Sequence, residues 1–302
     1  MFLLKFYFRL LILAALVSPK VLAAKQRDSD SLIGAERVPF SIYFADYFSG
    51  VSYSNISFRD FATSPLFYRG PALDLSMGWP VVQENSYREF GMNALFGLPS
   101  AVVPENSQFE VKSPGRFFFG NLNYSYLRKT NLLHSHALVY LGLTAASRFH
   151  FRINRALGNN GTGVEAFFNF MASGRLEKDF SRKSGEGKSW LLFKRKNDVF
   201  RTLAYQLNVG LINFNYRPGY AYGGFSEFDG SNTNGLQFLL DGHFWSLNGI
   251  RVQSRVEWII NKKKKYSNRW IYSWELITAP GKFEKFQFVS HTFTYSMLLF
   301  KK

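Results

Sequence analysis

Two short segments hold the residues whose types and spacing come nearest to a catalytic pattern. His134 and His136 flank Ser135, and Asp241 stands two residues before His243. Acyl hydrolysis by a serine requires the nucleophile and its histidine base within hydrogen-bond reach on one face. Neighbouring residues of a strand point to opposite faces, so Ser135 would point away from both histidines. We therefore expect no catalytic residue here, and a lipid-modifying acyl hydrolase remains an alternative.

The same segments are also potential metal sites. His134 and His136 share one face of a strand, as do Asp241 and His243, and side chains two residues apart can chelate an ion. The two segments are far apart in the sequence, and only the curvature of a sheet would decide whether they meet. Interior histidines hydrogen-bonded to acids are the simpler interpretation. We predict neither a metal nor another cofactor.

Charged and polar side chains recur at alternate positions along many segments and form the main candidate site. If these positions face the inside of a barrel, they either line a narrow pore or fill the interior with ion pairs. Mixed signs favour the filled interior, and the pairing that we predict is Arg251 and Arg255 with Glu275. The predicted interior residues are Asp74, Glu89, His134, His136, Arg148, Glu165, Arg175, Asp241, His243, Arg251, Arg255, Glu257 and Glu275, with Glu177 and Arg269 on the same parity.

A run of four lysines is the candidate contact with lipid phosphate. Lys262, Lys263, Lys264 and Lys265 follow one alternating segment and precede another. Basic clusters beside a membrane attract anionic headgroups. Charge runs in short turns more often serve only to keep the turn in water, and we favour that interpretation.

The segment that best shows the underlying element is Arg251 to Ile260. Arg251, Gln253, Arg255 and Glu257 fall on one face, and apolar residues with Ser254 fall on the other. This period of two predicts a β-strand with one polar side and one apolar side. Strands of this kind throughout a chain are typical of a transmembrane β-barrel, in which side chains alternate between lumen and lipid.

Most of the chain after residue 40 repeats this pattern. The segments 70–82 and 87–98 form a predicted hairpin, and Asn248-Gly249 predicts a second hairpin between 235–246 and the strand at Arg251. The segment 115–127 is also a predicted strand, but its sequence does not indicate which face lies inside. Further strands are predicted at 134–148, 163–180, 200–215, 268–278 and 285–300. We predict an antiparallel up-and-down barrel of 12 strands, one of them from a split of 40–58, with 10 or 14 as alternatives because bacterial barrels have even strand numbers.

The N-terminus indicates export. Lys5 and Arg9 precede the apolar run 10–17, and small residues follow up to Ala24, which is typical of a cleaved signal peptide over 1–24. The polar stretch 25–39 is a predicted periplasmic tail, and 40–302 is the barrel. Aromatic residues make up 18% of the chain and cysteine is absent. The net charge of +16 suits lipid phosphates, whereas export and the lack of a recognition motif argue against nucleic acid.

These features together resemble bacterial outer-membrane β-barrel proteins. The segments NVGLINFNYRPGY and HTFTYSMLLF are similar to uncharacterised barrels of the Bacteroidota. The resemblance implies an integral protein of the Gram-negative outer membrane, acting as a small channel or as a structural partner subunit of an envelope complex. Its expected partners are outer-membrane lipids and envelope proteins. A partner subunit would present outward aromatic residues, for which Trp79, Trp258, Trp270 and Trp274 are candidates.

Overall fold

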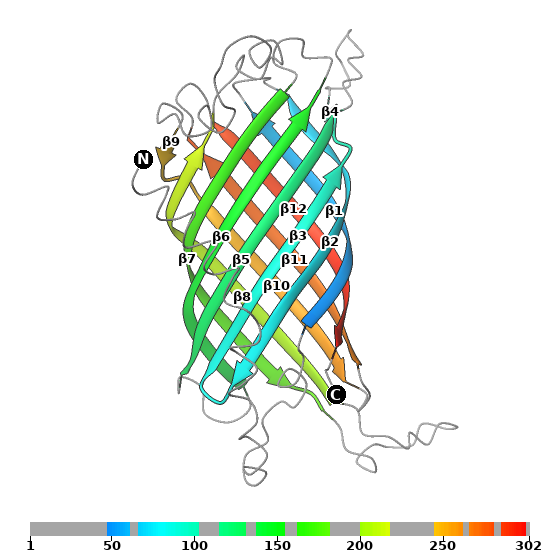
Figure 1. The fold of residues 1–302 in the computed structure, drawn as a ribbon, viewed down its shortest axis with the longest axis vertical. Coiled ribbons are helices and arrows are strands. Elements are labelled where there is room, and N and C mark those ends of the chain that lie inside the picture. The colour runs from blue at the N-terminus through cyan, green and yellow to red at the C-terminus, as the bar shows by residue number, and fades with distance from the viewer. Residues whose placement is uncertain are drawn as a thin grey trace, which may run out of the picture. The chain divides into compact units, whose positions relative to one another are not determined.

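A closed antiparallel β-barrel is the architecture of the computed structural model, which describes residues 47–60, 66–102, 115–130, 137–154, 162–181, 200–217, 245–261, 266–280 and 285–299 (Figure 1). The described residues form twelve strands. Their bounds are β1 Tyr47–Asp60, β2 Phe67–Gln83, β3 Ser86–Gly97, β4 Ser100–Val102, β5 Arg116–Thr130, β6 Ala137–Ile153, β7 Thr162–Asp179, β8 Phe200–Tyr216, β9 Trp245–Leu247, β10 Arg251–Asn261, β11 Tyr266–Ala279 and β12 Phe286–Leu299.

Ten of these strands close the ring. β1 pairs with β2 on one side and with β12 on the other, from Tyr47 opposite Leu299 to Asp60 opposite Phe286. The short strands β4 and β9 add to β2 and β8 outside this ring. The predicted fold class and the total of twelve strands are confirmed. The two strands beyond the ring are β4 and β9, however, and not a divided 40–58 segment, of which the described part belongs to the single strand β1.

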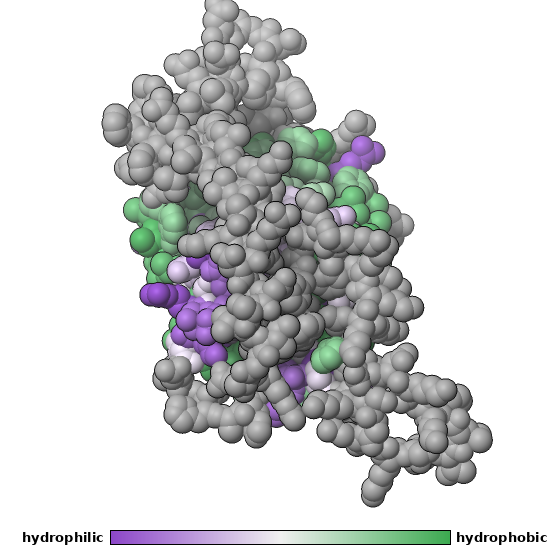
Figure 2. All heavy atoms as spheres, turned by 60° about the horizontal axis from the view of Figure 1, so that its bottom comes forward, coloured by the Kyte–Doolittle hydropathy of each residue, from purple (hydrophilic) through white to green (hydrophobic). Residues whose placement is uncertain are grey.

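The two faces of the strands have opposite chemistry. On β2, Leu73 and Leu75 point outward and are 64% and 65% exposed, whereas Asp74 between them is 6% exposed. Figure 2 shows hydrophobic residues on both flanks of the barrel wall, with patches of hydrophilic residues beside them. A protein in water would bury the leucines and expose the acid. The inverted arrangement is that of strands that cross a membrane. Among the described residues no helix has the length and apolar character of a membrane span.

The strand β5 resolves the face that the sequence left open. Phe117 and Phe119 are buried inside the barrel, and Phe118, Tyr124 and Tyr126 are exposed on its outer wall. Both faces of β5 are therefore aromatic at the Phe117 end. This composition explains why alternation between polar and apolar residues did not reveal the orientation of the strand.

The predicted hairpin at Asn248-Gly249 is wrong. β9 and β10 both run antiparallel to β8, with Leu247 opposite Phe214 and Val252 opposite Val209, so the chain does not reverse between them. Asn248 and Gly249 have φ values of 83° and 100° and form a kink within one line of chain.

Side chains of β8 stabilise this kink. Asn213 Nδ2 donates to the Gly249 carbonyl at 3.0 Å, and Asn215 Nδ2 donates to the Asn248 carbonyl at 2.8 Å. Positive φ is needed in tight hairpin turns and in strand irregularities alike, so the Asn-Gly signal does not distinguish between them. Most of the predicted strand 235–246 lies outside the described residues.

Replacing Gly249 with alanine should destabilise the barrel, because a Cβ atom there would lie 2.1 Å from the Thr278 carbonyl oxygen at a φ of +100°. We expect the free energy of unfolding to fall by about 1–3 kcal/mol, the cost of a non-glycine residue in that region. Urea unfolding of the refolded full chain, followed by tryptophan fluorescence, measures it. Gly120→Ala is the matched control, because its Cβ would meet no atom within 4 Å. Equal midpoints for the two variants would contradict the strain at Gly249.

Candidate site in the barrel interior

The interior of the barrel holds opposite charges in equal number. Six carboxylates and six arginines of the described residues are buried there: Asp60, Asp74, Glu89, Glu165, Glu177, Glu257, Arg148, Arg152, Arg175, Arg217, Arg251 and Arg269. Arg255 and Glu275 add one charge of each sign and retain some exposure. A buried charge is costly unless it is paired. The equal numbers allow most of these charges to pair within the barrel.

All of the predicted interior residues within the described ranges face inward. They are Asp74, Glu89, Arg148, Glu165, Arg175, Arg251, Arg255, Glu257 and Glu275. The strand period places them there, because each occupies the parity opposite to the exposed apolar residues of its strand. His134, His136, Asp241, His243 and the lysines 262–265 lie outside the described residues.

Glu257 on β10 is the centre of an ion network near the end of the barrel that holds Tyr47 and Leu299. Its carboxylate accepts from Arg175 Nη1 at 2.7 Å, pairs with Arg255 Nε at 2.6 Å and contacts Arg269 Nη2 at 2.8 Å. Glu257 is 0% exposed. The three arginines come from β7, β10 and β11, so one carboxylate connects three strands. We call this group, with Glu89 and Glu177, the lower ion network.

Glu89 extends the lower ion network across the lumen. It lies on β3 and pairs with Arg255 Nη1 at 2.6 Å and Arg269 Nη2 at 2.9 Å, and it accepts from the Tyr87 hydroxyl at 2.5 Å. The Arg175 guanidinium lies 4.3 Å from the centre of the Tyr87 ring, a cation–π contact. Because β3 and β10 are not neighbours in the ring, these bonds span the interior and obstruct it.

A second group of ion pairs lies nearer the opposite end of the barrel. Arg152 on β6 pairs with Asp60 on β1 and, at 2.5 Å, with Glu165 on β7, and Arg217 Nη2 pairs with Asp60 at 2.7 Å. Sequence reasoning named Glu165 and missed the other three residues. The signal was present for Arg152, which shares the parity of Arg148 on the same strand.

An aromatic layer, defined by Phe58, Tyr68, Phe117, Phe119, Phe167, Phe286 and Phe288, fills the barrel beside this second group. Phe119 and Phe288 stack with ring centres 6.1 Å apart, and Phe117 stacks on Phe58 at 5.3 Å. His150 lies among them and is fully buried, with its ring centre 4.8 Å from that of Phe119. Sequence reasoning missed His150 and this apolar part of the interior.

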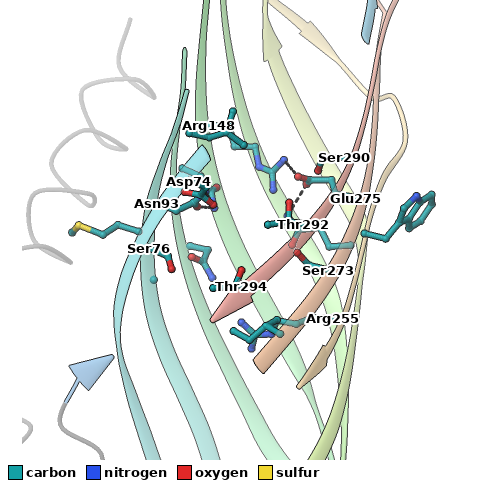
Figure 3. A pocket seen from close by; sticks show the side chains of 18 of the residues that line it. Asp74, Ser76, Asn93, Arg148, Arg255, Ser273, Glu275, Ser290, Thr292 and Thr294 are labelled. Carbon is teal, nitrogen blue, oxygen red and sulfur yellow. Dashed lines mark hydrogen bonds and ion pairs between the residues drawn. The ribbon is translucent and has the colours of Figure 1, made fainter. Parts of the chain in front are cut away.

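A cavity of about 170 Å³, lined by polar and apolar side chains, lies between the lower ion network and the aromatic layer. Asp74, Asn93 and Ser76 form one wall, and Figure 3 shows Arg148 and Glu275 facing it from other strands. Glu89 and Arg255 border it on one side, and Phe119 and Phe288 border it on the other. The cavity has room for several water molecules, each of which occupies about 30 Å³ in the liquid.

The predicted pairing of Arg251 and Arg255 with Glu275 is not the one that forms. Glu275 pairs with Arg148 of β6 and accepts from Gln253 Nε2 at 2.8 Å. In the register, Gln253 and not an arginine stands opposite Glu275. Arg251 instead donates to Asn169 Oδ1 at 3.0 Å and to Asn215. The sequence predicted partners on neighbouring strands, but the arginine that pairs with Glu275 lies across the ring on β6.

A metal site and a catalytic nucleophile each set requirements that the described histidines and acids would have to meet. No three histidine or acidic side chains in the described ranges cluster closely enough to hold a metal ion. The two ring nitrogens of His150 have no hydrogen-bond partner among the described residues. On the outer wall His291 Nδ1 is bonded to the Tyr272 hydroxyl at 2.9 Å. A nucleophile oriented by a base is therefore not formed at either described histidine.

Comparison with known proteins gives structural likeness alone. No protein family and no curated protein matches the sequence. The transport unit of the autotransporter AIDA-I from Escherichia coli is 6% identical with a TM-score of 0.37, and the match covers 93% of this chain and 97% of that one. The β domain of the Bordetella autotransporter BrkA is 6% identical with a TM-score of 0.29, covering 84% and 99%.

A third solved structure, the COG4313 outer-membrane channel from Pseudomonas putida F1, is 10% identical with a TM-score of 0.26, and the match covers 87% of this chain and 100% of that one. At these values the likeness does not extend beyond general architecture. The closed ring and the apolar wall confirm the predicted class, a bacterial outer-membrane β-barrel, and with it the outer-membrane location. The similarity to barrels of the Bacteroidota in particular stays a prediction.

Replacing Glu257 with glutamine keeps the size of the side chain and removes the charge that three arginines share. We expect the free energy of unfolding to fall by about 3–5 kcal/mol, because the loss of one partner leaves buried charges uncompensated. Guanidinium unfolding of the refolded full chain measures the change. Glu84→Gln makes the same replacement in an exposed turn and should cost less than about 1 kcal/mol. Similar losses in both variants would show that the lower ion network does not stabilise the barrel.

Proposed function

We propose that this outer-membrane barrel is closed by its own side chains and serves as a non-conducting structural or partner subunit of the envelope. The observation that carries the proposal is the pair of obstructions on either side of the central cavity. On one side the lower ion network spans the lumen from β3 to β10 and β11. On the other side the aromatic layer occupies the interior.

Each obstruction opposes ion flow for a different reason. An ion that passes the lower ion network must separate Glu257, which has no solvent exposure, from arginines held at 2.6–2.8 Å. An ion that passes the aromatic layer must leave its hydration shell among phenylalanine rings, which offer no replacement ligands. A ring of ten strands is close to the size of about 8 strands at which side chains just fill the interior.

The outer wall supports a role in contacts with lipid or with a protein partner. On β11 and β12, Trp270 lies 4.6 Å from Tyr295 and 5.7 Å from Phe293, measured between ring centres, and all three are exposed. Trp79 and Trp258 lie on other strands, where they pack on Phe90 and Phe180. Aromatic residues of this kind suit a membrane interface, and clusters of them also suit a protein interface.

A gated channel is the second candidate function. The central cavity favours it, because hydroxyl, amide and charged groups line a chamber that lies in the middle of the lumen. Such a channel would need the lower ion network and the aromatic layer to separate. A lipid-modifying acyl hydrolase is the third candidate, and the described residues offer no oriented nucleophile that favours it.

The refolded full chain should give no stable current steps in a planar lipid bilayer. Phe288→Ala and Arg255→Ala each weaken one obstruction, so either variant alone should remain silent and the double variant should conduct. Single-channel recording of proteins whose circular dichroism shows the folded barrel tests this. Stable steps from the unaltered chain would overturn the closed lumen and favour the channel. A silent double variant would show that these two obstructions are not what closes it.

A further inference from the structure

One wall of the central cavity holds a short chain of hydrogen bonds. Asn121 Nδ2 on β5 donates to Asn93 Oδ1 on β3 at 2.9 Å. Asn93 Nδ2 donates in turn to Asp74 Oδ2 on β2 at 3.0 Å. Adjacent strands therefore contribute one member each, in a row around the barrel.

The carboxylate determines the direction of this chain. An ionised carboxylate only accepts hydrogen bonds, so Asn93 must turn its NH₂ group toward Asp74 and its oxygen toward Asn121. Asn121 must then turn its own NH₂ group toward Asn93. Two acceptors are left over, Asp74 Oδ1 and Asn121 Oδ1. Both are buried, and neither has a hydrogen-bond partner among the described residues.

The charges of the side chains that line the cavity, like the two free acceptor oxygens, suit a positively charged ligand. Among the residues that line it, Arg148 pairs with Glu275 and Arg255 pairs with Glu89, so these charges cancel. Asp74 is the remaining acidic residue of the lining, it has no cationic partner among the described residues, and it is 6% exposed. A buried carboxylate without a cationic partner is costly, and a bound positive charge would offset that cost.

We propose that the central cavity binds one monovalent positive charge at the carboxyl group of Asp74, whose orientation the chain from Asn93 to Asn121 fixes. The ligand is an inorganic monovalent cation or a small protonated primary amine, which share this charge and the need for oxygen acceptors. A single uncompensated carboxylate matches a single charge, whereas divalent ions usually collect several carboxylates. The cavity of about 170 Å³ holds either ligand with accompanying water. The site does not depend on whether the lumen conducts.

Titration calorimetry of the refolded full chain tests the proposal. The protein in N-methylglucamine chloride is titrated separately with sodium chloride, potassium chloride and methylammonium chloride at constant ionic strength. We expect saturable binding of one equivalent in at least one arm. Binding of sodium or potassium identifies an inorganic cation site, and binding of methylammonium alone identifies an amine site.

Variants locate the bound charge. Asp74→Asn should weaken binding at least tenfold, because it removes the charge while nearly preserving the shape. Asp179→Asn makes the same replacement at an exposed strand end and should leave binding unchanged. Asn121→Ala removes the donor that orients Asn93 toward Asp74, so it should weaken binding at least threefold, and it gives an independent test if Asp74→Asn fails to fold. No binding to the folded unaltered chain would overturn the proposal, as would binding that the cavity variants do not weaken.

Discussion

The burial of Glu257 is the constraint on which the interior depends. A carboxylate with no solvent exposure is stable only with charged partners, and three arginines from three strands supply them. Two of these arginines also hold Glu89 on β3, across the lumen. The ladder hydrogen bonds close the ring from neighbour to neighbour. The ion network connects strands that are not neighbours, and so gives the barrel an internal core of its own.

The interior is layered along the barrel axis. Ions fill it near the end that holds Tyr47 and Leu299, aromatic rings fill it toward the other end, and polar groups line a cavity between them. The layers follow from the order of residues on single strands. On β12, Phe286 and Phe288 lie in the aromatic layer, and Ser290, Thr292 and Thr294 follow at the cavity.

This layering changes how the mixed interior charges are understood. Acids and arginines that face the inside of the barrel are compatible with a pore lining and with a filled interior. The short distances between their charged atoms show that, among the described residues, they form ion pairs. The aromatic layer adds a second closure that charge patterns do not indicate. Asp74 stands apart because its described hydrogen-bond partner is an amide, so it is the acid of the cavity wall that no arginine pairs with among the described residues.

The sequence by itself determined the strand type and most of the facing. Leu73 against Asp74 and Leu207 against Gln206 were assigned correctly, because side chains alternate along a strand whatever the rest of the fold does. Strand order and closure followed from the same pattern and from the even strand number of bacterial barrels. The sequence did not predict the aromatic inner face of β5, because Phe117, Phe118 and Phe119 give both faces of the strand the same character.

Only the tertiary structure decided which charges meet. Arg255 finds Glu89 across the lumen, 166 residues away in sequence, and Glu275 finds Arg148 rather than an arginine of the next strand. These pairs depend on the diameter and stagger of the closed ring, which no local pattern encodes. The same holds for Asn248-Gly249, whose positive φ values suit a hairpin as well as a kink. Local physics determines the conformation of a residue and the face it occupies, and the closure of the ring determines its partners.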